Sequence, residues 1–146
     1  MSVGQLLKQK GKAIHQIRSN VSLSNCLKIM NAKRIGSLLV MDKKGNLEGL
    51  VSERDILRTV NKVKGKSFNI PVVNVMTPRK NLVVGKMEGS IHEVMETMTK
   101  KRVRHLPIMD GDKVVGIVSI GDVVKSLLDE VLAENKQMQD YIYGKY

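Results

Sequence analysis

A serine followed three residues later by an aspartate occurs twice in the chain, each time after an apolar run. Residues 49–55 read Gly-Leu-Val-Ser-Glu-Arg-Asp, and residues 116–122 read Gly-Ile-Val-Ser-Ile-Gly-Asp. A serine and an acid at this spacing are typical of a helix start, where both cap free backbone N–H groups. A carboxylate at a helix start can also accept two hydrogen bonds from a ribose diol, and the helix N-terminus favours phosphate. Each copy therefore predicts a helix cap, half of a nucleotide site, or both.

Other catalytic and metal-binding signatures are missing from the sequence. There is no Gly-x-Gly stretch of a dinucleotide fold, and the Gly-Lys-Ser at residues 65–67 has Val60 where a phosphate-binding loop needs glycine. The histidines, which are possible zinc ligands, are far apart in the sequence: His15, His92 and His105. We therefore expect a protein that is not an enzyme and that holds neither a metal nor a catalytic cofactor.

The two Ser-x-x-Asp copies belong to an internal repeat. Residues 30–42 align with residues 98–110 and share Met, Lys-Arg, Leu, Met and Asp at the same places. Each unit reads as a short strand, a helix, two apolar runs across a Gly-containing turn, and a second helix that begins at Ser52 or Ser119. We predict an α+β fold, similar to an α/β sandwich. Its two β-α-β-β-α units pack around a pseudo-twofold axis and form two equivalent clefts.

The sequence pattern divides the chain into four parts. We assign residues 1–64 to the first repeat with an N-terminal segment, 65–71 to a linker, 72–133 to the second repeat and 134–146 to a C-terminal helical extension. The last helix carries apolar residues at helical spacing: Val124, Leu127, Leu128, Val131, Leu132, Met138, Tyr141 and Ile142. This face either docks on its own domain or serves self-association.

Charge and composition narrow the class of partner. The 146 residues carry a net charge of +11, and residues 1–41 contain no Asp or Glu. Such a surface suits phosphorylated small molecules, nucleic acid or other acidic partners. With no Trp and one Phe, the chain lacks the aromatic platforms that single-stranded nucleic acids stack on. A nucleic-acid-binding module is therefore our secondary hypothesis, and the short apolar runs predict no membrane span.

The single cysteine, Cys26, lies in an apolar helical pattern. It cannot form an internal disulfide, and this suits a reducing compartment. We expect the cytoplasm, with an organelle matrix as the alternative location. We interpret Cys26 as a small buried apolar residue, the alternative being a reactive thiol.

Three motifs in order resemble a known family. Ser52-Glu-Arg-Asp55, Arg104-His-Leu-Pro107 and Ser119-Ile-Gly-Asp-Val-Val124 are similar to motifs of small stand-alone proteins with a tandem pair of CBS domains, a Bateman module. The resemblance covers nearly the whole chain. It implies a non-enzymatic sensor that binds an adenine nucleotide (AMP, ADP, ATP or NAD(H)) between the repeats. It also implies a homodimer of CBS pairs and a protein effector in another chain.

The resemblance gives nine residues a role in ligand binding. It implies ribose contacts from Asp55, Asp122, Ser52 and Ser119, base or sugar contacts from Thr77 and Ile120, and phosphate contacts from Arg104, His105 and Arg54. The three basic residues also have structural alternatives: a surface ion pair for Arg54, a solvated strand-edge charge for Arg104, and packing for His105.

The two halves of the expected site are unequal. Between Ser and Asp, the first copy has Glu53-Arg54 and the second has Ile120-Gly121. At the place of Arg104-His105, the first unit has the uncharged pair Gly36-Ser37. We therefore predict that one cleft binds a phosphorylated adenosine better than the other. A structural pair with two unused clefts is the remaining alternative.

Overall fold

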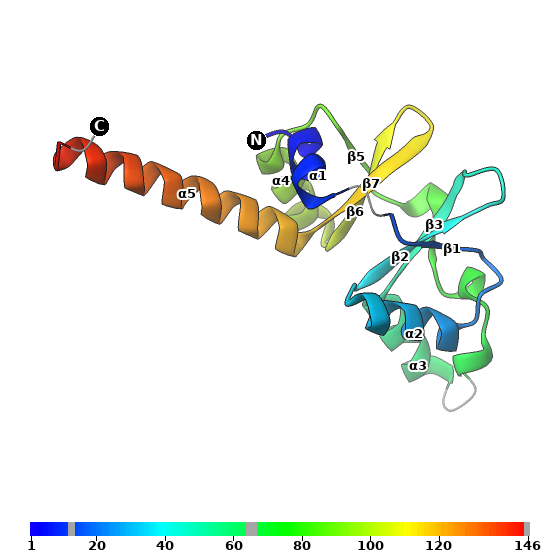
Figure 1. The fold of residues 1–146 in the computed structure, drawn as a ribbon. Coiled ribbons are helices and arrows are strands. Elements are labelled where there is room, and N and C mark those ends of the chain that lie inside the picture. The colour runs from blue at the N-terminus through cyan, green and yellow to red at the C-terminus, as the bar shows by residue number, and fades with distance from the viewer. Residues whose placement is uncertain (12–13, 64–66, 145–146) are drawn as a thin grey trace.

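The computed structural model describes residues 1–11, 14–63 and 67–144, which form two small sheets with helices packed on them (Figure 1). The helices are α1 Val3–Lys10, α2 Leu23–Lys33, α3 Glu53–Val63, α4 Ile91–Lys101 and α5 Ile120–Ile142. The strands are β1 Gln16–Ile17, β2 Ser37–Met41, β3 Leu47–Ser52, β4 Thr77–Pro78, β5 Gly85–Lys86, β6 His105–Asp110 and β7 Lys113–Ser119. Short 3-10 turns are η1 Ser67–Asn69, η2 Val72–Asn74 and η3 Arg79–Asn81. The strand orders are β1-β2-β3-β4 and β5-β6-β7.

The two halves share the same strand registers. In the first hairpin Leu38 lies opposite Val51, and in the second Leu106 lies opposite Val118. Each hairpin has a register irregularity at the corresponding step of its first strand. In each half a short first strand runs parallel to the hairpin's first strand. The α+β class and the repeated β-α-β-β-α order predicted from the sequence are confirmed.

The main helices of the two repeats begin and end in the same way. Ser22, Ser90 and Ser119 each accept a hydrogen bond from the backbone N–H three residues later, and this satisfies one of the free donors of the first turn. Helices α2 and α4 both end on an arginine in the left-handed conformation, Arg34 and Arg102, each with a φ of 54°. Left-handed non-glycine residues are uncommon. Their matched positions end each helix and turn the chain into β2 or β6.

Two segments cross from one half to the other. Helix α1 packs on the second repeat, where Val3, Leu6 and Leu7 share a core with α4, β6 and β7. Conversely, Val72 is buried in the core of the first repeat, and β4 pairs with β3. Residues 1–64 and 72–133, the two groups predicted from the sequence, each therefore begin with a segment that packs on the other repeat. Of the linker 65–71, residues 65 and 66 lie outside the described residues, and 67–69 form η1.

An aliphatic cluster joins the two sheets. Leu39 and Leu50 of the first sheet are buried together with Met109 of the second. Burial of such side chains stabilises the contact by about 25 cal/mol per Å² of apolar surface. The contact brings the starts of α3 and α5 close to the opposite repeat, and the clefts form there.

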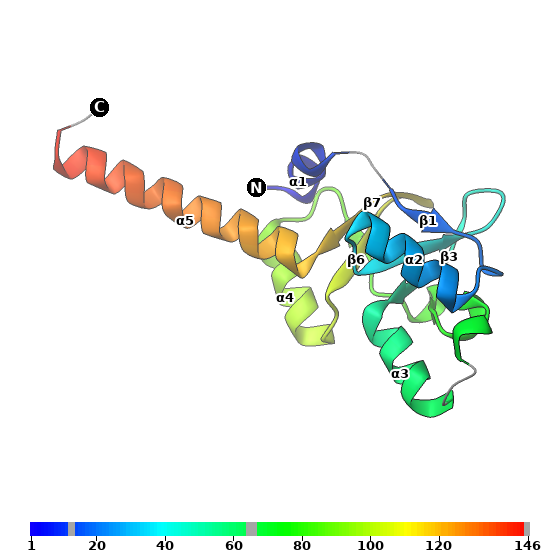
Figure 2. The same cartoon turned by 60° about the horizontal axis from the view of Figure 1, so that its bottom comes forward.

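Helix α5 spans 23 residues, and its C-terminal part projects away from both sheets in two views (Figures 1 and 2). Among the helices that the structure describes, none is both long and apolar enough to cross a membrane.

Candidate functional site

A cleft of about 300 Å³ lies between the repeats at the start of α3, and we call it the first cleft. Its lining includes seven of the nine predicted ligand residues: Ser52, Arg54, Asp55, Thr77, Arg104, His105 and Ile120. Aliphatic walls come from Leu50, Leu82, Val83 and Val103. Apolar walls with a few convergent polar groups are the usual composition of a small-molecule site.

Asp55 caps α3 and lines the first cleft at the same time. Its Oδ2 atom accepts hydrogen bonds from the Ser52 backbone N–H at 2.9 Å and from the Ser52 hydroxyl at 3.1 Å. The Asp55 backbone N–H donates to the Ser52 Oγ at 3.3 Å. None of these bonds involves the Asp55 Oδ1 atom. The cap therefore orients the carboxylate without using both of its oxygens, so capping and ligand binding are compatible.

Basic side chains outnumber acidic ones around the first cleft. Arg54 and Arg58 lie one turn apart on α3, so they face the same side of that helix. The lining contains four arginines and two acids: Arg54, Arg58, Arg102 and Arg104 against Glu53 and Asp55. Guanidinium groups match phosphate in both charge and hydrogen-bond geometry. Our sequence reasoning missed Arg58 and Arg102. The four-residue spacing after Arg54 and the Lys-Arg pair shared by both repeats were signals for them.

His105 lines the first cleft and also a second cleft at the start of α5. Burial is the largest cause that lowers the pKa of its imidazole. Glu53 raises this pKa by a smaller amount, and Lys10 lowers it. The net pKa lies below the ordinary value for histidine, so the ring is neutral at neutral pH. His105 therefore offers a neutral hydrogen-bonding group to a ligand instead of the positive charge expected at this motif.

A second cleft, of about 410 Å³, lies at the start of α5 and is lined by Ser119, Asp122 and Lys10. The Asp122 Oδ2 atom accepts hydrogen bonds from the Ser119 backbone N–H at 2.9 Å and from the Lys10 ammonium at 2.7 Å. The Lys10 ammonium also donates to the Ile117 carbonyl oxygen at 2.9 Å. An ammonium of this chain thus contacts the carboxylate that, by the resemblance, would accept a ribose.

The Lys10 contact changes the ionisation of Asp122. Burial raises the pKa of the Asp122 carboxyl, but the hydrogen bonds from Lys10 and Ser119 outweigh it. The net pKa lies below the usual range for aspartate. Asp122 is therefore ionised at neutral pH and is held by an internal cation.

A glycine lies three residues before each serine, and a different segment of the chain packs on it beside each cleft. A Cβ atom on Gly49 would lie 2.6 Å from the carbonyl oxygen of Thr77, and one on Gly116 would lie 2.7 Å from Leu7 Cδ2. The protein itself therefore occupies the space that each glycine leaves. The missing side chain admits β4, and with it Thr77, beside the first cleft. At the matching place beside the second cleft it admits α1, which carries Lys10.

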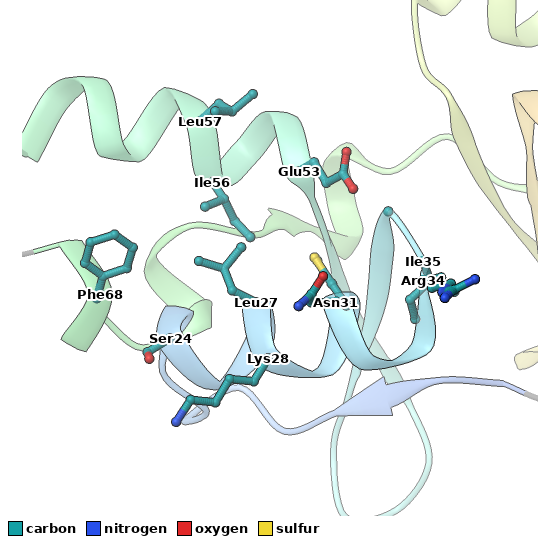
Figure 3. A pocket seen from close by; sticks show the side chains of 12 residues that line it. Ser24, Leu27, Lys28, Asn31, Arg34, Ile35, Glu53, Ile56, Leu57 and Phe68 are labelled. Atoms are coloured by element: carbon teal, nitrogen blue, oxygen red, sulfur yellow. The ribbon is translucent and has the colours of Figure 1, made fainter.

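A larger cavity, of about 810 Å³, lies between α2 and α3 and belongs to the first repeat alone (Figure 3). Leu27 and Ile56 face each other across it, with Phe68 at one end and Glu53 at the other. None of the nine predicted ligand residues lines this cavity. The smaller first cleft, by contrast, combines an oriented carboxylate with several arginines.

Other chemistry has little support in the parts of the chain that the structure describes. Within residues 1–11, 14–63 and 67–144, no cluster of three or more His, Cys, Asp or Glu side chains is placed to hold a metal ion. Cys26 is fully buried, and burial raises the pKa of its thiol to about 11. This environment agrees with a packing role for the cysteine.

Comparison with known proteins agrees with the geometry. The family model of the CBS domain matches residues 12–62 and 69–129. The chain is 30% identical to the mitochondrial CBS domain-containing protein CBSX3 of Arabidopsis thaliana, over 99% of this chain and 73% of that protein. It is similar to a CBS-domain protein structure from Agrobacterium tumefaciens (TM-score 0.82, 33% identity, 86% of this chain and 98% of that one). It also resembles the structure of CBSX2 in complex with AMP (TM-score 0.72, 25% identity, 88% and 96% covered). The chain therefore belongs to the CBS-domain family and contains a tandem pair of CBS repeats.

Proposed function

We propose that the chain is a non-enzymatic regulatory module that binds an adenine nucleotide in the first cleft. The observation that carries the proposal is the meeting of an oriented carboxylate, Asp55, with four arginines in one cleft between the repeats. The similarity to a CBS pair in complex with AMP supports it. The second cleft binds a ribose more weakly, because the ligand must displace Lys10 from Asp122.

Each group that lines the first cleft suits one part of a nucleotide. The Asp55 carboxylate accepts hydrogen bonds from the two hydroxyl groups of the ribose diol, with Ser52 beside it. Aliphatic side chains, including Ile120, pack on the two faces of the adenine, and Thr77 provides a polar contact at the base or sugar. Arg104 and Arg54 bind phosphate, and the neutral His105 donates or accepts one hydrogen bond.

The size and charge of the first cleft favour particular nucleotides. Its volume of about 300 Å³ lies at the lower end of the usual range for small-molecule pockets. This suits AMP or ADP better than the larger NAD(H). The four arginines favour a phosphorylated ligand over S-adenosylmethionine, which carries a positive charge. We therefore place AMP and ADP first among the nucleotides that the family resemblance implies.

A ligand in the first cleft contacts both repeats. Ser52 and Asp55 belong to the first repeat, and Arg104 and Ile120 belong to the second. Nucleotide binding shifts the packing of the repeats to the extent that one arrangement binds more tightly than another. A partner that contacts both repeats reads this shift. The CBS repeats occupy residues 12–62 and 69–129, so we infer that the effector lies outside these 146 residues.

A thermal-shift panel with AMP, ADP, ATP, NADH and S-adenosylmethionine tests the proposal. A ligand at one hundred times its Kd stabilises the folded chain by about 2.7 kcal/mol, so AMP and ADP should raise the Tm clearly. Adenosine without phosphate should bind weakly. 2′-Deoxy-AMP, which lacks one hydroxyl group facing Asp55, should bind about 10- to 100-fold more weakly than AMP, the usual cost of one hydrogen bond to a charged group.

The panel also separates the alternatives. If none of these compounds raises the Tm, the nucleotide proposal is wrong. Binding to a single-stranded oligonucleotide that weakens steeply with salt would instead support the nucleic-acid hypothesis. If neither ligand class binds, a structural pair with unused clefts remains.

A further inference from the structure

Helix α5 carries two different apolar stripes. One stripe holds the helix on its own repeat: Val123 is buried in the second core, and Leu127 packs against that core. The other stripe includes Val124 and Leu128, which are 50% and 54% exposed. Each of these follows a core-facing residue by one position and therefore lies about 100° further around the helix. The second stripe is free to contact a partner while the first stays docked.

The exposed stripe has the spacing of a coiled-coil seam. From residue 124 the steps between its members are four, three, four, three and four residues. This alternation is the seam of a coiled coil, and two further exposed apolar residues, Leu132 (56%) and Tyr141 (73%), take the flanking positions e and g. In heptad terms, Leu128, Asn135 and Ile142 take position a, and Val124, Val131 and Met138 take position d. The apolar members are 50–69% exposed.

Most of this seam lies beyond the CBS repeat. The family match ends at residue 129, whereas α5 continues to Ile142. Residues 131–139 are all exposed. The ion pairs described between α5 and the rest of the molecule involve Asp122 and Glu130, both before residue 131. Asp122 contacts Lys10 at 2.7 Å, and Glu130 contacts the Met1 amino group at 3.3 Å and His92 at 3.5 Å. The seam therefore runs along the projecting part of the helix (Figures 1 and 2), where the fold of the repeat does not account for it.

We propose that α5 pairs with α5 of a second copy of this chain, as a parallel two-stranded coiled coil over residues 128–142. The two Asn135 side chains hydrogen-bond to each other inside the seam. A second copy is the fitting partner because a two-fold axis along the seam places the same residues opposite one another, as in an isologous interface. The coiled-coil segment is about 22 Å long at 1.5 Å per residue.

Asn135 determines the orientation. In a parallel coiled coil each a residue faces the a residue of the other chain, so the two amides meet and satisfy each other. In an antiparallel pair Asn135 would face a d residue such as Val131 or Met138, and its amide would be buried without a partner. A single asparagine at position a specifies register and oligomeric state in this way. Across the parallel seam Glu134 faces Gln139, so the flanking positions bring no like charges together.

Cross-linking of the full-length chain tests the parallel coil. Ile142→Cys places one thiol per chain at the end of the seam, and the native Cys26 is fully buried and does not compete. The parallel arrangement brings the two introduced thiols together, so mild oxidation should give a disulfide-linked dimer rapidly. Gln137→Cys, on the outward face of the same helix, is the matched control and should cross-link at least tenfold more slowly.

A second pair of substitutions tests whether the seam itself brings the thiols together. In the Ile142→Cys background, Met138→Glu places like charges across the seam and should slow cross-linking at least tenfold. Gln137→Glu makes the same charge change one residue away and should leave the rate unchanged. The proposal is overturned if Ile142→Cys cross-links no faster than Gln137→Cys, or if Met138→Glu does not slow it. None of these measurements involves a nucleotide, so failure here leaves the nucleotide proposal intact.

Discussion

Replacing Lys10 with methionine should strengthen ligand binding in the second cleft. Methionine keeps an apolar stem of similar length and removes the ammonium that lies 2.7 Å from Asp122. The Lys10 and Asp122 side chains are 35% and 24% exposed, so solvent screens the pair, and its contribution to folding is about 1 kcal/mol or less. For a chain of this size that lowers the Tm by about 2–4 °C.

The same contact opposes binding at the second cleft, because a ribose must displace the ammonium before it reaches the carboxylate. A contact of about 1 kcal/mol weakens binding roughly fivefold, since 1.4 kcal/mol corresponds to a factor of ten. Isothermal titration calorimetry with AMP measures this directly. The native chain should bind AMP most tightly in the first cleft, and Lys10→Met should lower the Kd of the second, weaker site about fivefold.

Lys8→Met is the matched control for this experiment. Lys8 lies on the same helix and is exposed, so the substitution makes the same charge change without touching Asp122. It should leave the Kd of the second site unchanged. The expectation is refuted if Lys10→Met also leaves this Kd unchanged, or if Lys8→Met lowers it equally.

Three further results follow from the structure. Because the pKa of Asp122 is lowered in the folded chain, its stabilising contribution is present above its unfolded pKa of about 3.9 and disappears as the pH falls through the lower folded pKa. The difference in Tm between the native chain and Asp122→Ala should therefore shrink as the pH is lowered below 4 in thermal melts, and a constant difference would contradict the sign. Gly49→Ala should destabilise the fold by about 1–3 kcal/mol in urea unfolding, because its Cβ would lie 2.6 Å from the Thr77 carbonyl oxygen. Gly116→Ala should cost less, since the nearest atoms belong to a flexible side chain of α1. The Cys26 thiol, with a pKa of about 11, is about 0.1% ionised at pH 8, so it should react with a disulfide reagent only in denaturant, and rapid reaction in the folded chain would show that the thiol is accessible.

The repeat and its hairpins were predictable because local patterns carry them. A Gly-containing turn between two apolar runs determines a hairpin, and the alignment of Gly49 with Gly116 anticipates their matched places in the strand registers. Most residues of the first cleft were also predictable from the sequence. Ser52 and Asp55 share one helix start, and the motif at Arg104 begins the strand of the other repeat that faces them.

The sequence does not predict which repeat the crossing segments pack on. The apolar spacing of Val3, Leu6 and Leu7 predicts a buried helix face but not which repeat covers it. The contact between Lys10 and Asp122 spans 112 residues, and nothing local to either residue indicates it. The neutral state of His105 likewise depends on burial by both repeats, which a motif does not reveal.

The most direct test of the central claim is titration of AMP into Asp55→Ala and Asp122→Ala. Both substitutions remove a helix cap of the same geometry, with a 2.9 Å bond from the serine N–H to the aspartate in each copy. The loss of a cap is therefore matched between them. We expect that Asp55→Ala abolishes AMP binding, whereas Asp122→Ala keeps the affinity of the native chain. Loss of binding in Asp122→Ala with full binding in Asp55→Ala would contradict this expectation.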